Sequence, residues 1–322
     1  MFGKIKGTGS YRPVQVWDNN KLSHMMDTSD EWIRGRTGIG QRHIATKAET
    51  VSQMASKAAQ AALEAAKMQP DEIDLILVST MSAEKIMPCT ACQVQEIIGA
   101  DNATCFDLNS ACTGFLVALN TAQAYLGQQI YRTALVIGAE ALSHLTNWQD
   151  RSTCVLFGDG AGAVVLEAEE SATYIQATHS IGNGGKALTC DSRNQPEYVT
   201  KNPDFFSTYM RMDGKEVFKF AVSKVPEVIQ EVLKKAGKNK EDIRYYMLHQ
   251  ANQRIVFSVA KHLKEPLEKF PMNIEMLGNT SSASIPILLD EWNKKGRLNT
   301  GDWLVFSGFG GGLTYGASLL NW

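Results

Sequence analysis

The two halves of the chain share a pattern of one helix followed by one strand. Val51 to Met68 is alanine-rich and amphipathic, which is typical of a helix, and the apolar run Ile73 to Val78 predicts a strand behind it. The same order returns at Val225 to Ala236 and Ile243 to Leu248. Similar residues align at one spacing: Leu63 with Leu233, Ala66 with Ala236, Asp71 with Glu241, and Ile73 with Ile243. This internal repeat predicts two related halves of alternating helices and strands.

Two glycine-rich segments show a second similarity between the halves. Val155 to Leu166 and Val305 to Leu319 each contain an apolar run, several glycines and another apolar run. The pattern predicts a strand, a tight turn and a second strand closing each half. We therefore expect the junction near Glu167 to Ser171. The polar stretch Asn183 to Phe206 is rich in turn formers and predicts an excursion that would help to shape a substrate entrance.

Composition indicates a large soluble enzyme. With 322 residues, of which 44% are hydrophobic and 20% charged, the chain can bury the cores of two domain-sized units. A formal charge of −2 and the lack of a basic block argue against a nucleic-acid-binding protein. No apolar stretch has the length of a membrane span or of a signal-peptide core. We therefore expect a cytoplasmic protein without membrane contact.

The six cysteines predict reduced thiols, one of which is a candidate nucleophile. Cys89 and Cys92 have redox or zinc-like spacing, but no second pair completes a metal site, so we expect ordinary core thiols. Cys112 lies among small residues at the start of the apolar helical stretch Leu116 to Leu126. The positive end of a helix dipole favours a thiolate, which makes Cys112 a candidate nucleophile. From spacing alone, an inert core cysteine is the alternative.

Two other residues carry side chains that a cysteine nucleophile could use. His249 follows the apolar stretch Tyr245 to Leu248 and should stand at the carboxyl end of a strand, where open α/β sheets place their chemistry. Asn279 follows a glycine in a predicted tight turn. Each also has an ordinary explanation, as a satisfied core histidine and as a turn residue.

Together and in this order, Cys112, His249 and Asn279 resemble the triad of the β-ketoacyl-acyl carrier protein synthase III family, condensing enzymes of the thiolase superfamily. The resemblance spans the chain. Further matching segments are Asp27 to Ile33, Arg36 to Ile39, Asp150 to Thr153, Phe157 to Ala163 and Phe309 to Gly312. It implies an α/β thiolase-like fold of two duplicated βαβαβαββ halves in layered helix and sheet packing. Residues 1–170 would carry the cysteine and residues 171–322 the histidine and asparagine, with the active site between them.

The resemblance also implies the chemistry of the triad. Cys112 would take an acyl group from acyl-coenzyme A, while the backbone N–H groups of Cys112 and Gly311 form an oxyanion hole. His249 and Asn279 would then hold the thioester carbonyl of malonyl-acyl carrier protein as carbon dioxide leaves. A Cys, His and Asn set alone also fits papain-like proteases, so the glycine-rich end and the coenzyme A residues distinguish the two classes.

The resemblance further assigns binding residues. Trp32 and Arg151 would sandwich the adenine of coenzyme A, Arg36 and Thr37 would contact the polar groups of the nucleotide, and Asn252 would contact the pantetheine arm. Basic residues expected to receive the acidic carrier protein are Lys219, Arg254 and Lys261. At position 87, some relatives place an aromatic residue that reaches across a dimer interface to the acyl pocket. The chain has Met87 there, which leaves the primer length open.

The expected function is therefore a homodimeric acyltransferase that starts fatty-acid synthesis. It would condense a short acyl-coenzyme A, foremost acetyl-coenzyme A, with malonyl-acyl carrier protein to give a 3-oxoacyl product. Coenzyme A arrives as part of a substrate, so no cofactor or metal is expected. One alternative is a secondary-metabolism paralogue with the same triad that condenses or only transfers acyl groups. Another is a non-catalytic acyl-coenzyme A-binding protein, which would be expected to have lost part of the triad.

Overall fold

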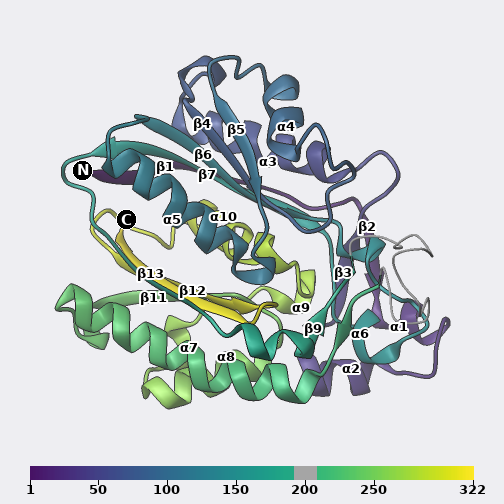
Figure 1. Cartoon of the computed structure of the whole chain (residues 1–322). Helices are drawn as coiled ribbons and strands as arrows, with labels where there is room; N and C mark the ends of the chain where they lie inside the picture. Colours follow the sequence, from purple (N-terminus) through teal and green to yellow (C-terminus); the bar gives the residue numbers. More distant parts are fainter. Residues whose placement is uncertain (192–208) are drawn as a thin grey trace.

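Two β-sheets, one from each half of the chain, lie face to face with two helices between them (Figure 1). This architecture comes from a computed structural model, which describes residues 1–191 and 209–322. The first sheet has the order β1 (Phe2–Tyr11), β7 (Gly160–Glu169), β6 (Thr133–Glu140), β4 (Leu75–Ser79) and β5 (Thr104–Leu108). The second has the order β8 (Tyr174–Ser180), β13 (Thr314–Asn321), β12 (Trp303–Gly310) and β11 (Ile243–Leu248).

The two sheets have the same topology. In each, one corresponding pair is parallel, β4 with β6 and β11 with β12, and the other shared pairs are antiparallel. In the part of the chain that the structure describes, β5 alone has no counterpart in the second sheet. Matching strand orders confirm that the repeat seen in the sequence is a repeat of structure.

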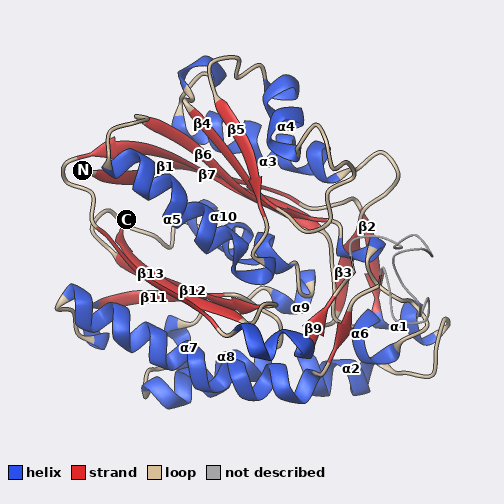
Figure 2. Cartoon of the chain, viewed as in Figure 1, coloured by secondary structure: helices blue, strands red, loops and turns tan. Residues whose placement is uncertain are grey.

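The helices form three layers that alternate with the two sheets (Figure 2). Between the sheets lie α5 (Gly114–Gly127) and α10 (Ser284–Lys294). The outer face of the first sheet carries α3 (Val51–Ala66) and α4 (Thr90–Ile98), and that of the second carries α7 (Gly214–Ala236) and α8 (Gln253–Leu263). Shared apolar clusters of buried side chains join each helix layer to its sheet, which gives the molecule its core.

Glycines in β1 allow α3 to approach the sheet very closely. A Cβ atom at Gly9 would lie 2.2 Å from the carbonyl oxygen of Ala58, and one at Gly7 would lie 2.3 Å from that of Ala62. The facing residues of α3 are alanines, so both surfaces are flat. Larger side chains on either element would therefore push the helix off the sheet.

Shorter elements gather at one end of the two sheets, on the right in Figure 1. The strand pairs there are β2 (Gln15–Asp18) with β3 (Gln41–Ile44), and β9 (Leu188–Thr189) with β10 (Arg211–Met212). The short helices are α1 (Asn19–Ser23), α2 (Asp30–Thr37), α6 (Arg151–Cys154) and α9 (Ile274–Leu277). Within residues 1–191 and 209–322, no helix is both long and apolar enough to cross a bilayer.

The helix and strand of each half were predicted in the right places, with one large error in extent. The first helix starts at Val51 as predicted, and β11 has the predicted bounds. By contrast, α7 begins at Gly214, well before the predicted start at Val225. Its N-cap is Asp213, whose carboxylate accepts hydrogen bonds from two backbone N–H groups of the first turn, and Pro226 lies inside the helix.

The predicted strand over Val155 to Phe157 was wrong. These residues follow α6, and β7 begins only at Gly160. Their side chains pack in an apolar cluster with Leu22 and Ile33, which lies away from both sheets. The true counterpart of β12 is therefore β6, and the glycine-rich segment enters β7 directly.

The first sheet ends in sequence at Glu169, and the first strand of the second sheet begins at Tyr174. We therefore propose to divide the chain into halves 1–170 and 171–322. Of the predicted excursion Asn183 to Phe206, residues 183–191 form a short helical turn and β9, and the part from residue 192 onward lies outside the described residues.

Candidate active site

Cys112 lies in a tight turn between β5 and the central helix α5. This first turn, Ala111–Thr113, has left-handed backbone at Ala111, with φ 45°. The end of β12 faces it from the second half: a Cβ atom at Gly310 would lie 2.8 Å from the Cys112 nitrogen and 2.9 Å from its Cβ. Only a glycine allows the strand to approach the cysteine this closely.

His249 reaches the same place from β11. Its N–H group donates to the carbonyl of Ser307 at 2.8 Å, which continues the parallel pairing of β11 with β12 by one residue. Its ring packs against the ring of Phe309, with 5.1 Å between the centres. Phe309 directly precedes Gly310, so the imidazole and the thiol lie around the end of one strand.

Asn279 is fixed by backbone bonds to the first half. Its N–H donates to the carbonyl of Leu156 at 2.8 Å, and its carbonyl accepts from the N–H of Gly158 at 3.0 Å. Its side-chain Oδ1 accepts from the N–H of Ser281 at 2.9 Å, which leaves Nδ2 as the donor available to a ligand. Ser281 opens a second turn, Ser281–Ala283, before α10, and its hydroxyl lies beside Cys112.

Burial controls the charge state of these groups. Burial raises the pKa of the Cys112 thiol to about 12, and the nearby Ser281 hydroxyl, which would donate to a thiolate, acts in the opposite direction. Burial also lowers the pKa of His249 to about 3. The resting site therefore holds a neutral thiol and a neutral imidazole. The helix dipole predicted to favour a thiolate is outweighed, since Cys112 is only 6% exposed and α5 begins two residues later.

Several buried polar atoms in this region have no hydrogen-bond partner among the described residues. They include both ring nitrogens of His249 and the hydroxyls of Ser281 and Ser79. Buried donors and acceptors are normally paired, and unpaired ones cost free energy. Such atoms are available to hydrogen-bond a substrate.

Gly311 lies next to the first turn, as an oxyanion-hole residue would. A Cβ atom there would lie 3.4 Å from the Cβ of Ala111. The N–H groups of Gly311 and Cys112 thus come from two segments that meet at the thiol. Their role in stabilising an oxyanion stays a prediction.

At the end of the molecule that carries the short elements, Trp32 is held by two arginines. The guanidinium carbons of Arg36 and Arg151 lie 4.4 and 4.7 Å from the centre of its ring. Arg151 also donates to the carbonyl of Asp27 at 2.6 Å. The structure therefore brings together three of the residues predicted to bind coenzyme A.

The other two predicted coenzyme A residues have structural contacts of their own. Thr37 is buried, and its hydroxyl donates to the carbonyl of Ile33 at 2.7 Å, so it caps its own helix and is not displayed to a nucleotide. Asn252 caps α8 and donates from Nδ2 to the carbonyl of Arg36 at 3.0 Å. Thr37 therefore bonds within its own helix, and Asn252 ties α8 to α2.

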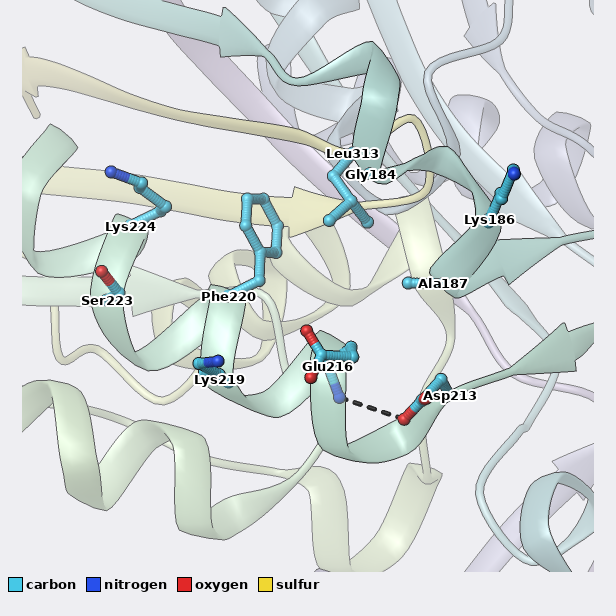
Figure 3. Close-up of a pocket in the computed structure, with 10 residues that line it drawn as sticks. All are labelled: Gly184, Lys186, Ala187, Asp213, Glu216, Lys219, Phe220, Ser223, Lys224 and Leu313. Atoms are coloured by element: carbon cyan, nitrogen blue, oxygen red, sulfur yellow. Dashed lines mark hydrogen bonds between the residues drawn. The ribbon is translucent and has the colours of Figure 1, made fainter.

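The predicted carrier-protein residues lie on neighbouring outer helices. Lys219 belongs to α7, and Arg254 and Lys261 belong to α8. All three are exposed, although Arg254 also donates to the carbonyl of Gly35 at 2.6 Å. Lys219 lines a cavity of about 510 Å³ together with Phe220 and Leu313 (Figure 3). Met87 is 83% exposed.

The sequence matches known families over most of this architecture. Residues 106–184 match 3-oxoacyl-[acyl-carrier-protein (ACP)] synthase III, and residues 233–322 match its C-terminal part. The chain is 49% identical over 321 residues to the β-ketoacyl-[acyl-carrier-protein] synthase III of Clostridium novyi (strain NT), which covers 99% of this chain and 98% of that protein. The chain belongs to the 3-oxoacyl-[acyl-carrier-protein] synthase III family.

Solved structures support the same conclusion for this synthase. The 3-oxoacyl-[acyl-carrier-protein] synthase III of Aquifex aeolicus VF5 superimposes with a TM-score of 0.93 at 44% identity, over 99% of this chain and 100% of that one. The priming β-ketosynthase of the R1128 polyketide pathway has a TM-score of 0.92 at 35% identity, over 99% and 96%. The synthase is thus an acyltransferase of the condensing type with the thiolase-like fold.

Two buried residues of the synthase site were not predicted from the sequence. Ser281 holds the Asn279 amide and lies beside the thiol. Glu140 ends β6 and accepts a hydrogen bond from the neighbouring Ser282. A serine in a polar run and a glutamate at the end of an apolar strand carry no local signal of such contacts. Both depend on how the two halves pack.

Proposed function

We propose that this synthase condenses a short acyl-coenzyme A, acetyl-coenzyme A foremost, with malonyl-acyl carrier protein and so starts fatty-acid synthesis. The observation that carries the proposal is the imidazole of His249. It is buried at the end of β12, the strand that also faces Cys112, and its two ring nitrogens have no partner among the described residues. A neutral histidine and the free Nδ2 of Asn279 can donate to one carbonyl oxygen without a prior proton transfer.

In the first half-reaction, Cys112 attacks the thioester carbon of acyl-coenzyme A. The new bond joins its sulfur to the acyl carbon, the bond to the sulfur of coenzyme A breaks, and the thiol proton ends on the departing coenzyme A. The N–H groups of Cys112 and Gly311 would stabilise the tetrahedral oxyanion. Such donors contribute about 3 to 4 kcal/mol each in comparable enzymes.

In the second half-reaction, malonyl-acyl carrier protein takes the place of coenzyme A. Its carbon–carbon bond to the carboxylate breaks and carbon dioxide leaves, while the electron pair moves to the thioester as an enolate. His249 and Asn279 would hold the enolate oxygen. The enolate carbon then attacks the acyl group on Cys112, which releases the 3-oxoacyl product and a cysteine that regains a proton from water.

The same geometry disfavours a papain-like hydrolase. Such an enzyme needs a histidine that accepts the thiol proton and later delivers water, so it uses a base with a pKa near the working pH. Burial instead lowers the pKa of His249 to about 3. In the described residues no carboxylate or amide orients its ring. The neutral imidazole of His249 is suited to donate a hydrogen bond to a carbonyl oxygen.

The rival enzyme is a priming ketosynthase of secondary metabolism, favoured by the similarity to the R1128 enzyme. Both would share the triad, and they would differ in primer and carrier protein. A panel of acyl-coenzyme A primers of increasing length and branching separates them. Short straight primers should react fastest here, and a preference for long primers with acetyl-coenzyme A inert would favour the rival.

We further propose a homodimer that works in the cytoplasm without a cofactor. At the edge of the first sheet, β5 leaves one side unpaired, and the neighbouring Ile86 and Met87 are 70% and 83% exposed. A second copy could cover them and bring Met87 to an acyl pocket. Six cysteines scattered through the chain fit a reducing compartment. The reaction as written consumes only the two thioesters.

Incubation with isotope-labelled acetyl-coenzyme A tests the first half-reaction. Intact-mass and peptide analysis should find one acetyl group on Cys112 and none in a Cys112→Ser variant. Malonyl-acyl carrier protein should then release carbon dioxide and remove the label from the enzyme. An unlabelled Cys112 would contradict the proposed function, and label transfer without carbon dioxide would indicate an acyltransferase that does not condense.

A further inference from the structure

The internal repeat gives the turn of the nucleophile a counterpart in the second half. The first turn precedes α5 and the second turn precedes α10, the two helices between the sheets (Figure 1). Both turns begin with left-handed backbone, φ 45° at Ala111 and 48° at Ser281. Cys112 in the first turn therefore corresponds to Ser282 in the second.

The strand ends that face these turns correspond as well, but they carry different residues. β12 ends at Gly310, where the missing side chain leaves room for Cys112. β6 ends at Glu140, whose carboxyl group occupies the matching place: Ser282 Oγ donates to Glu140 Oε1 at 2.8 Å. The duplicate of the nucleophile site is thus filled by a buried acid.

Glu140 is completely buried and well supplied with donors. Besides Ser282, its other oxygen Oε2 accepts from Ser82 Oγ at 2.6 Å, from the N–H of Met81 at 3.2 Å and from Thr80 Oγ1 at 3.3 Å. Burial raises its pKa to about 7, while these hydrogen bonds favour the charged form. The acid therefore links three segments of chain at one point.

The second turn connects this acid to the reaction centre. Ser281, which adjoins Ser282, holds the amide of Asn279 through its N–H group and lies beside the thiol through its hydroxyl. A shift of the turn would therefore move two groups that face the substrate. Negative charge on Glu140 also raises the pKa of Cys112, in addition to the larger effect of burial.

We propose that Glu140 is a positioning residue for the nucleophile: through Ser282 it holds the second turn in place, and its charge makes the Cys112 thiol less reactive. The inference rests on the nucleophilic role proposed for Cys112. A purely structural glutamate would stabilise the fold without changing the reactivity of the thiol, so reactivity is the property to measure.

Among the described residues, the titratable groups at or near the two turns are Cys112 in the first turn, Glu140 at the end of β6, and His249, whose ring packs at the end of β12. Asp159 directly precedes Gly160, the residue of β7 that pairs with Glu140. Its carboxylate accepts hydrogen bonds from Ser143 and Ala45 instead. The facing ends of β12 and β13 contribute glycines and Thr314. Removal of the charge of Glu140 should therefore change mainly the pKa of the Cys112 thiol.

The first experiment measures the rate at which iodoacetamide alkylates Cys112 as a function of pH. Glu140→Gln keeps the size of the side chain and removes the charge, so the thiolate becomes easier to form. The profile should move to lower pH by about half a unit to one unit, with alkylation at pH about 8 faster by about threefold to tenfold. The matched control is Asp290→Asn, because Asp290 is equally buried but bonds to Thr8 and Ser10 of β1. Its profile should coincide with that of the wild type.

The second experiment removes the hydrogen bond between Ser282 and Glu140 and leaves the charge of Glu140 in place. Ser282→Ala should lower the turnover number with malonyl-acyl carrier protein about tenfold, because misplaced groups cost catalysis steeply, while the alkylation profile stays in place. Its melting temperature shows whether the variant is folded. A Glu140→Gln profile identical to the wild type, or a Ser282→Ala enzyme with full turnover, would overturn the inference. Failure of acetyl-coenzyme A to label wild-type Cys112 would instead refute the proposed function, and the alkylation result would still stand.

Discussion

Arg151 lies over Trp32 with 4.7 Å between the guanidinium carbon and the centre of the indole ring. Arg36 approaches the same ring at 4.4 Å, so two cations contact the indole. An adenine ring that stacks between Trp32 and Arg151 would displace a cation–π contact and replace it with a similar one. Binding at this position therefore needs a moving arginine and a fixed tryptophan.

Replacement of Arg151 should therefore weaken coenzyme A binding selectively. Arg151→Ala should raise the KM for acetyl-coenzyme A about tenfold, since loss of a stacked guanidinium costs about 1 to 2 kcal/mol. The KM for malonyl-acyl carrier protein should be unchanged. Arg132→Ala is a suitable control, because Arg132 is exposed and its guanidinium forms an ion pair with Glu167 at 2.9 Å. Steady-state kinetics with each substrate varied in turn decide the matter, and equal effects on both would refute an adenine site.

Loss of the His249 or Asn279 side chain should separate the two half-reactions. His249→Ala and Asn279→Ala should each lower carbon dioxide release by about a hundredfold to a thousandfold, because each removes one donor from the enolate oxygen. Acetylation of Cys112 should persist within about tenfold of the wild-type rate. Rapid-quench mass analysis measures the first step and radiolabelled carbon dioxide the second. A variant that lost both steps equally would assign His249 to activation of the thiol.

A single methyl group at Gly310 should block the nucleophile. In Gly310→Ala the new Cβ would lie 2.8 Å from the Cys112 nitrogen, so strand or turn must shift. We expect acetylation to fall by at least about a hundredfold, with a loss of about 1 to 3 kcal/mol in the free energy of unfolding. At Gly214 an added Cβ would make only an ordinary contact of 3.7 Å with Met212. Gly214→Ala should therefore behave as wild type in both assays.

The stability of the synthase should depend on pH through two buried groups with opposite signs. The pKa of His249 falls from 6.5 to about 3, so its contribution is present above pH 6.5 and is lost as pH falls. The pKa of Glu140 rises from 4.5 to about 7, so its contribution is full below pH 4.5 and is lost as pH rises. Between pH 4.5 and 6.5, the pKa values of Glu140 and His249 in the unfolded chain, the two contributions to the free energy of unfolding change with pH in opposite directions and cancel.

Without the carboxyl group of Glu140, the pH dependence of stability that comes from His249 should therefore become measurable. In Glu140→Gln, the free energy of unfolding should rise with pH by about 1 kcal/mol per unit between about pH 5 and 6, relative to the wild type. Urea titrations at the two pH values provide the measurement. Parallel pH dependence of the two proteins would show that Glu140 does not titrate in this range.

Charge reversal on the outer helices should affect only the carrier-protein step. Lys219→Glu and Lys261→Glu should each raise the KM for malonyl-acyl carrier protein severalfold, with a smaller effect at high salt, because exposed charges are screened. The KM for acetyl-coenzyme A should not change. Lys67→Glu, at the exposed end of α3, is the control. An effect of all three substitutions alike would point to net charge and not to a docking site.

The sequence predicted those parts of the fold and site that depend on local pattern. Periodicity located α3 and β11, because one face of each meets an apolar layer. The resemblance selected Cys112, His249 and Asn279. In the structure Cys112 and His249 lie near the end of β12 and Asn279 adjoins the second turn, and their joint role stays a prediction. Local pattern failed at Val155 to Phe157, where an apolar run packs in a separate cluster instead of pairing in a sheet.

Properties set by burial and by contacts between the halves could not be predicted in this way. The helix position of Cys112 suggested an acidic thiol, but desolvation has the larger effect in the unliganded protein. Thr37 was expected to face the nucleotide, yet its hydroxyl is bonded within its own helix. The roles of Glu140 and Ser282 can be recognised only when the two turns are compared, because their hydrogen-bond partners come from distant segments.

The backbone bonds of Asn279 to Leu156 and Gly158 make the two halves inseparable as working units. A fragment that ends near residue 170 would keep the sulfur but lose its imidazole and its amide. The complementary fragment would lack Leu156 and Gly158, whose backbone groups hold Asn279. Any attempt to regulate this protein by splitting it into two reassembling pieces should therefore leave each piece inert and restore turnover only on reunion.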